Sequence, residues 1–164
     1  MTVVLGIDIG VTGAISAVDS YGSAQIADIP TLGIAGKRMV RRRIDARGLL
    51  ALVRHFVPPG QQAMAIIEDI HTMPGAGNSP QSQGSLMHSL GVVQTVLEIA
   101  RLEITSVSPQ AWKRHFGLIG KEKRDALGVA RTLYPLQGHM LKRVKDHNRA
   151  DSLLLAHWGI GELA

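Results

Sequence analysis

Two stretches of this chain form apolar runs that end at a carboxylate, and they constrain the fold more than any other feature. The first run, residues 3–7, is followed by Asp8 and then by the turn-forming glycines Gly10 and Gly13. An unbroken apolar run predicts a strand that is buried on both faces of a sheet. A charge inside such a sheet costs free energy unless it is neutralised. We therefore expect Asp8 at the strand's end, either beside a cation, most simply a metal ion, or capping the turn through its own backbone.

The second run, residues 63–67, ends at Glu68 in the same way. It follows a predicted helix, so a right-handed crossover is expected to place it parallel to the first strand. If the two strands are neighbours in the sheet, Asp8 and Glu68 lie side by side. Two carboxylates that close repel each other unless a cation lies between them.

The rest of the pattern predicts one α/β domain over residues 1–164, with a mixed sheet flanked by helices. Short turns between the first three strands are suited to antiparallel pairing, so these strands should form a meander. A basic run at 36–43 is expected to be a loop or an edge, and a loop rich in glycine, proline, serine and glutamine is expected at 73–83. The predicted strands are 3–8, 13–18, 24–29, 63–68 and 102–107, and the predicted helices are 45–55, 84–101, 109–115, 121–134 and 147–159.

A third acid, Asp151, lies near the start of the strongly apolar last helix and is expected to point inward. His147, four residues earlier, shares its face, and Asn148 is also a neighbour. Asp146 is five residues earlier, which is about 140° away on a continuous helix, so it can join a site only from the cap or the loop. Three readings stay open: Asp146 as the helix N-cap, His147 as an exposed residue, and Asp151 as a partner of the helix dipole.

Composition narrows the function. The net charge is +5 and the pI is near 10.0, which favours a polyanionic partner, nucleic acid first. The chain has no cysteine, which excludes disulfides, thiolate metal sites and a cysteine nucleophile. We expect no membrane-spanning segment and no secretory signal, and hence an intracellular, cytoplasmic protein. Clustered carboxylates suit Mg²⁺ or Mn²⁺ and are what two-metal phosphoryl transfer requires.

The segments around these acids resemble the RuvC-type Holliday junction resolvases, in particular the phage and plasmid-borne branch. The matching segments are GIDIG with Thr12-Gly13, the strand ending at Glu68, SVSPQAWK at 106–113, GKEKR at 120–124 and RADSLLLA at 149–156. The resemblance implies an RNase H-like fold with a five-stranded sheet, a homodimer, and symmetric Mg²⁺-dependent nicking of two opposing strands of a four-way DNA junction. Mn²⁺ is expected to substitute, and a bacterial or phage-encoded source is expected.

The family's acidic residues fall on Asp8, Glu68 and Asp151. The chain departs from the better-known bacterial pattern three residues before the last aspartate, where an acid or a histidine is expected and Asn148 stands. Asparagine is a poorer metal ligand, so the fourth catalytic position is assigned to Asp146, with His147 as its alternative.

Basic and loop residues are expected to contact the DNA. Cations at the start of a helix oppose its dipole, so stability does not explain the cluster at 121–124 and phosphate contact does. The run at 36–43 either holds a junction arm or is a solvated edge. In the loop after Glu68, either His71 and Met73 open the junction centre by stacking or wedging, or the loop is simply exposed. The predicted DNA-binding residues are Lys113, Lys121, Lys123, Arg124, Arg41, Arg42, Arg43, His71 and Met73, with Lys37 and Arg38 in the same basic run.

Three other functions remain open. The chain is similar in its Asp-x-Gly-x-Thr turn to one lobe of an actin-like ATPase or sugar kinase, but such proteins enclose a nucleotide between two lobes and 164 residues supply one. No nucleotide is therefore expected. An RNase H-like nuclease acting on RNA or simple DNA is the second alternative, and a junction-binding protein without catalytic activity is the third.

Overall fold

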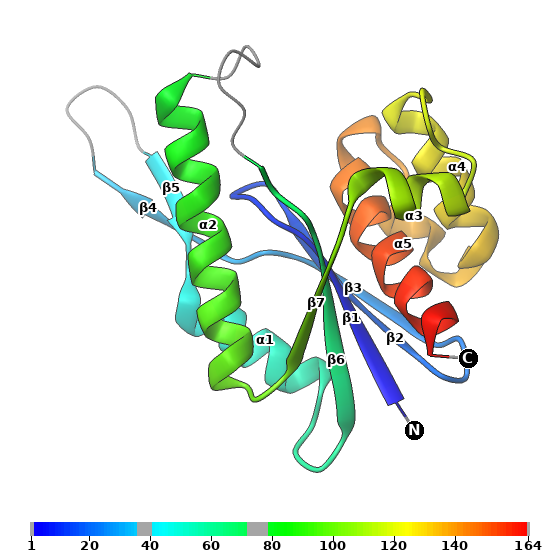
Figure 1. Cartoon of the computed structure of the whole chain (residues 1–164), viewed down its shortest axis with the longest axis horizontal. Helices are drawn as coiled ribbons and strands as arrows, with labels where there is room; N and C mark the ends of the chain where they lie inside the picture. The colour runs from blue at the N-terminus through cyan, green and yellow to red at the C-terminus, as the bar shows by residue number, and fades with distance from the viewer. Residues whose placement is uncertain (1, 36–40, 72–78, 164) are drawn as a thin grey trace.

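A five-stranded sheet forms the middle layer of the molecule (Figure 1). The computed structural model describes residues 2–35, 41–71 and 79–163. The strand order is β3-β2-β1-β6-β7, in which β1 pairs antiparallel with β2 and parallel with β6. The sheet strands are β1 (Thr2–Asp8), β2 (Ala14–Asp19), β3 (Ala24–Asp28), β6 (Gln62–Glu68) and β7 (Glu103–Val107). The predicted mixed sheet, an antiparallel meander continued by parallel strands, is confirmed.

The apolar runs explain why β1 and β6 are central. Residues Val3 to Ile7 of β1 are buried on both faces, because helices cover both sides of the sheet. In the parallel pair, Ile7 lies opposite Ile67, so the two strands reach their carboxyl ends together. Asp8 and Glu68 each follow directly in their own strand, as predicted.

The helices form two layers, each with its own apolar core. On one face lie α1 and α2, and on the other lie α3, α4 and α5 (Figure 1). Asp45, Ser79 and Ser108 each cap a helix by accepting a hydrogen bond from its first turn. The helix bounds are α1 (Ala46–Phe56), α2 (Pro80–Ile99), α3 (Pro109–His115), α4 (Lys123–Leu133) and α5 (His147–Glu162).

Helix α5 packs on β1 with no side chain between the two backbones at Gly6. A Cβ atom at Gly6 would overlap the carbonyl oxygen of Ser152 and the backbone nitrogen of Ala156. A buried hydrogen bond lies nearby, between the hydroxyls of Ser16 and Ser152, which are 2.6 Å apart. This close approach sets the distance between α5 and the strand that carries Asp8.

The structure adds a β-hairpin that was not predicted. Strand β4 (Thr31–Ile34) pairs with β5 (Arg41–Ile44), which contains the basic residues expected in a loop or edge. The hairpin is mostly exposed, so it lacks the buried apolar alternation by which a strand is recognised. Arg42 supports it by donating from Nε to the Thr31 hydroxyl at 2.8 Å.

Other differences concern element boundaries. Helix α2 begins at Pro80 rather than residue 84, because Ser79 caps it and proline is favoured in a first helical turn. Two short 3₁₀ segments, η1 (Pro135–Met140) and η2 (Val144–Asp146), precede α5 and were not predicted. In the described part of the chain, every helix is too short or too polar to cross a membrane.

Candidate active site

Three carboxylates from distant parts of the chain meet at one edge of the sheet. Asp8 ends β1, Glu68 ends β6, and Asp151 lies on the second turn of α5. Burial raises the pKa of Asp8 to about 8, and the negative charges of Asp151 and Glu68 add to this increase. The three acids therefore interact electrostatically, as the strand ends and the helix face predicted.

Asp151 shows the same effect to a smaller degree. Burial raises its pKa to about 6, the charge of Glu68 adds to the rise, and Lys113, His147 and Lys123 oppose it. Lys113 and Lys123 also lower the pKa of Asp8. Two lysines, from α3 and from the start of α4, thus act on the carboxylates from the α5 side of the sheet.

Glu68 is oriented by a tryptophan that was not predicted to belong to the site. The indole Nε1 of Trp112 donates to Oε2 of Glu68 at 2.8 Å, and the Trp112 side chain is buried. A buried indole requires a partner for its N–H, which is the signal that could have linked it to an acid. Lys113, the next residue, has its ammonium 5.2 Å from the centre of the Trp112 ring.

The donor set fits a hard divalent cation. Three clustered carboxylates offer only oxygen, which Mg²⁺ and Mn²⁺ prefer, and two of the three have raised pKa values that a cation would lower again. Within residues 2–35, 41–71 and 79–163, no three acidic or histidine side chains are close enough to share one ion as they lie. Among the three acids, Glu68 is oriented by a residue outside the cluster, because it accepts the hydrogen bond from Trp112.

Asp146 lies apart from this cluster. Its oxygens accept hydrogen bonds from the backbone N–H of Arg143 at 2.8 Å and from the Arg143 guanidinium at 2.8 to 3.3 Å. Those bonds lower its pKa to about 2, and the side chain is buried. The residue stands at the N-cap position of α5, but its side chain makes no capping hydrogen bond to that helix. It is therefore engaged as part of an arginine clamp, with Arg149 also 3.5 Å away.

The other two candidates near α5 have different environments. The side chain of Asn148 donates to the Thr12 carbonyl oxygen at 2.6 Å and so ties α5 to the turn that follows Asp8. His147 faces Asp151 closely enough for its positive form to lower the pKa of that carboxyl. Its Nδ1 lies 3.1 Å from the Val144 carbonyl oxygen, which leaves Nε2 unused by this contact.

The remaining predicted DNA-binding residues are spread over three places. Lys121 and Arg124 are exposed beside Lys123, and Arg124 pairs with Glu122 at 2.7 Å. Arg41, Arg42 and Arg43 lie on the exposed strand β5. His71 is exposed, with Nε2 3.5 Å from Asp69. Three further candidates, Lys37, Arg38 and Met73, lie outside the described residues.

Comparison with known proteins identifies one relative in sequence. The chain is 33% identical over 144 residues to the chloroplastic Holliday junction resolvase MOC1 of Chlamydomonas reinhardtii. The match covers 85% of this chain and 15% of that protein, so the chain spans about a seventh of the relative's length. No family model matches the chain.

Solved structures share the fold. Thermus thermophilus RuvC in complex with a Holliday junction substrate matches with a TM-score of 0.61 and 15% identity, covering 100% of this chain and 97% of that one. The yeast mitochondrial Holliday junction resolvase Ydc2 matches with a TM-score of 0.57 and 13% identity, covering 96% and 77%. The resemblance predicted from the sequence is thus confirmed, and the chain has the RNase H-like fold of the RuvC-type Holliday junction resolvases.

Proposed function

We propose that this chain is a metal-dependent endonuclease that resolves four-way DNA junctions by paired, symmetric nicks. The observation that carries the proposal is the convergence of Asp8, Glu68 and Asp151, where burial first, and then the charges of the other two acids, raise the pKa of Asp8 to about 8. Such a cluster is unfavourable in an inert protein and suits one that binds cations. The similarity to MOC1, a Holliday junction resolvase, favours four-way junctions as the substrate.

Asp8, Glu68 and Asp151 would hold Mg²⁺, for which Mn²⁺ substitutes. A metal bound there would supply the chemistry for activating a water molecule and for stabilising the leaving 3′ oxygen of the cut phosphodiester. Trp112 keeps one oxygen of Glu68 occupied and so fixes the direction in which the other points. Lys113 and Lys123, which lower the pKa of Asp8, are positioned to hold the phosphate that approaches it.

For the fourth position we favour His147 over Asp146. To bind a metal, Asp146 would have to break its bonds with Arg143. Its low pKa reflects how strongly those bonds stabilise the carboxylate in its present position. His147 already faces Asp151 and leaves Nε2 unused by its contact with Val144. Lys121, Arg124 and the arginines of β5 are proposed to contact DNA backbone away from the cut.

We further propose that the chain forms a single nuclease domain and acts as a homodimer, because two opposed nicks require two sites. An apolar groove of about 500 Å³ between α1 and α2 supports this arrangement. It includes Leu50, Met87 and Ile99, and the last two are exposed. The groove lies on the face of the sheet opposite α5, so a partner there would leave the carboxylates open to DNA.

The cleavage test compares Asp8→Asn with the wild type on a labelled four-way junction and on a matched duplex. We expect the variant to lose cleavage by orders of magnitude in Mg²⁺ or Mn²⁺ and to bind the junction as well as before, since removing a negative charge does not weaken attraction to phosphate. Glu162→Gln, the same charge change at the far end of α5, is the control and should cut normally.

The same assay decides the fourth position and the rival functions. Asp146→Asn should cut at nearly the wild-type rate, while His147→Ala should be much slower. A slow Asp146→Asn beside an active His147→Ala would return the role to the aspartate. Wild-type cleavage of plain duplex or RNA hybrid at the junction's rate would favour the general nuclease, and binding without cleavage would favour a junction-binding protein.

A further inference from the structure

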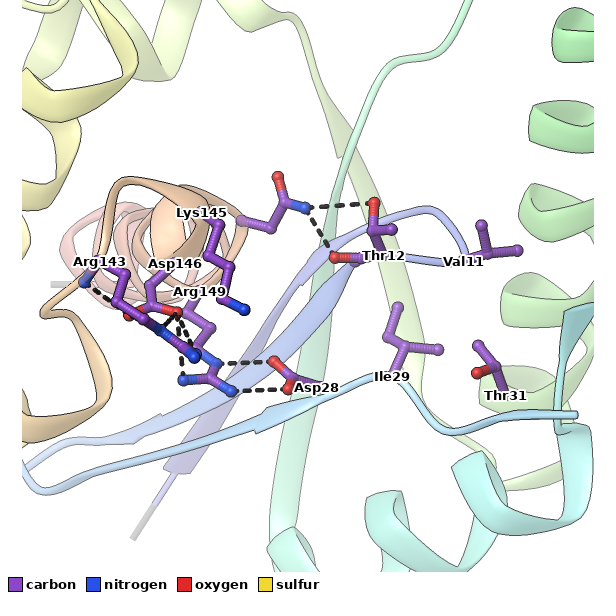
Figure 2. Close-up of a pocket in the computed structure, with 11 residues that line it drawn as sticks. Val11, Thr12, Asp28, Ile29, Thr31, Arg143, Lys145, Asp146 and Arg149 are labelled. Carbon is purple, nitrogen blue, oxygen red and sulfur yellow. Dashed lines mark hydrogen bonds and ion pairs between the residues drawn. The ribbon is translucent and has the colours of Figure 1, made fainter. Parts of the chain in front are cut away.

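A second cavity adjoins the candidate active site on the β3 side of Asp8. It measures about 320 Å³ and is lined by the turn after β1, the end of β3 and the residues that lead into α5 (Figure 2). Thr12 and Gly13 form part of its wall, so the cavity shares with Asp8 the turn that follows β1. It lies apart from Trp112, Lys113 and Lys123, none of which lines it.

Two arginine–aspartate ion pairs line the base of this cavity. Arg149 makes a two-bond contact with Asp28 at 2.6 and 2.7 Å, and Arg143 makes another with Asp146. Two carboxylates thus balance two guanidinium groups, with Arg149 also 3.5 Å from Asp146, and the pKa values of both acids are lowered by the pairing. The four side chains form a polar and electrically balanced base, in which Arg143 and Asp28 are exposed.

Lys145 adds a positive charge that this base does not balance. It is exposed, lines the cavity and forms no ion pair with any described residue. Figure 2 shows its ammonium directed into the space between the Arg149–Asp28 pair and Thr12. The exposed Thr12 side chain supplies a hydroxyl on the opposite wall, whose oxygen accepts a hydrogen bond from Asn148 at 3.4 Å and whose O–H can donate. A cation and a hydroxyl that face each other across a polar base suit an oxyanion.

The basic hairpin extends this positive surface. Thr31 lines the cavity and also accepts hydrogen bonds from Arg42 of β5, at 2.8 Å to its hydroxyl and 3.3 Å to its carbonyl oxygen. Arg42 therefore lies beside the cavity that Lys145 lines. An extended polyanion matches this arrangement better than a small, isolated anion does.

We propose that this cavity binds a backbone phosphate of the DNA strand that lies on the β3 side of the cut, with Lys145 as its principal contact. The inference rests on the proposed function and adds to it a second phosphate track, separate from Lys113 and Lys123. One track lies on each side of the carboxylates. The strand would thereby be held on both sides of the phosphodiester that is cut.

Lys145→Gln tests the proposal, with Lys142→Gln as the matched control. Both lysines are exposed and lie three residues apart, but Lys142 does not line the cavity. Binding is measured in EDTA, so that no strand is cut, on a four-way junction and on a duplex over a range of salt concentrations. We expect Lys145→Gln to flatten the slope of log affinity against log salt by about 0.9, the value for one lost phosphate contact, and the control to leave it unchanged.

Equal slopes for Lys145→Gln and Lys142→Gln on both DNAs would overturn the proposal. If inorganic phosphate raises the melting temperature of the wild type but not of Lys145→Gln, while the slopes stay equal, the cavity takes free phosphate and the DNA contact is wrong. Failure of the proposed function gives a different result. A wild type that does not prefer junctions would contradict the proposed function, while the slopes of the two variants on duplex DNA would still test the phosphate contact at Lys145.

Because the chain contains no cysteine, a single-cysteine variant can locate the DNA directly. Lys145→Cys carrying an iron–EDTA cleavage reagent should cut the junction strand at a few nucleotides on one side of the crossover. Lys142→Cys with the same reagent should cut weakly or elsewhere. Identical cutting patterns from both positions would contradict a phosphate contact at Lys145.

Discussion

At Asp8, the burial that creates the acidic cluster also makes the ionised side chain unfavourable for the stability of the fold. The folded protein raises the pKa of Asp8 from 3.8 to about 8, and that of Asp151 to about 6. Between the ordinary pKa of 3.8 and these raised values, the folded state binds more protons than the unfolded state does. Stability from these groups is therefore greatest below about pH 4 and is lost as pH rises toward 8. Asp146 has the opposite effect, since its lowered pKa makes its contribution disappear as pH falls from 4 toward 2.

The metal-free protein should thus become less stable as pH rises from 5 to 8, by on the order of 1 kcal/mol per pH unit. Asp8→Asn should be more stable than the wild type in EDTA at pH 8, and the difference should shrink toward pH 5. Urea unfolding at several pH values measures this. Glu162→Gln serves as the control, and an Asp8→Asn curve that runs parallel to the wild type would contradict the raised pKa.

The sequence supplied the three acids of the cluster but not their partners. Asp8 and Glu68 could be found because a carboxylate at the end of an apolar strand is costly without a cation. Asp146 could not be placed, because its bonds to Arg143 form in a 3₁₀ turn that helical spacing does not describe. Trp112 joins Glu68 from 44 residues away, and no local pattern encodes that contact.

The contact between β1 and α5 decides whether the site forms. Gly6→Ala would drive a methyl group into the backbone of α5 at Ser152 and Ala156, where no side chain can move aside. We expect a loss of about 3 kcal/mol or more in the free energy of unfolding, at the upper end of the usual cost of overpacking. Cleavage by the fraction that still folds should also fall, since Asp151 moves with α5.

Gly128→Ala provides the matched control for this substitution. Gly128 lies inside α4 and a Cβ atom there meets nothing within 4 Å. Alanine should stabilise that helix by about 0.5–1 kcal/mol through its higher helix propensity. Urea unfolding of both variants separates the steric effect from the loss of backbone freedom. Equal stabilities for the two variants would show that α5 does not approach β1 as closely as described.

Elements with a buried face were predictable and exposed ones were not. The five sheet strands and five main helices appear where apolar runs and helical spacing placed them. The β4–β5 hairpin carries charge where a strand signal would carry buried side chains, and it is held by pairing and by Arg42. The start of α2 was placed too late because Ser79 and Pro80 were read as loop residues rather than as a cap and first turn.

For the whole molecule, the proposed paired cutting requires the proposed homodimer. Met87→Glu puts a charge into the groove between α1 and α2 at a side chain that is already 41% exposed, so the monomer should fold normally. We expect the variant to be monomeric by light scattering at concentrations where the wild type is dimeric. On a plasmid with an extruded cruciform it should produce nicked circles rather than linear DNA.

Leu136→Glu is the control for this substitution, because Leu136 is 88% exposed and lies outside the groove. It should remain dimeric and should linearise the plasmid. A dimeric Met87→Glu, or a wild type that is monomeric while still linearising the plasmid, would contradict an interface in this groove.

The three acids lie far apart in the sequence, so they leave the ribosome at different times during synthesis. Residues 8 and 68 are translated early, whereas Asp151 arrives on α5, the last helix to leave the ribosome in this sequence. Until α5 docks on Gly6, a nascent chain holds two acids at the end of an uncovered sheet and lacks the third. A chain that stops before Asp151 therefore cannot assemble the three-acid cluster.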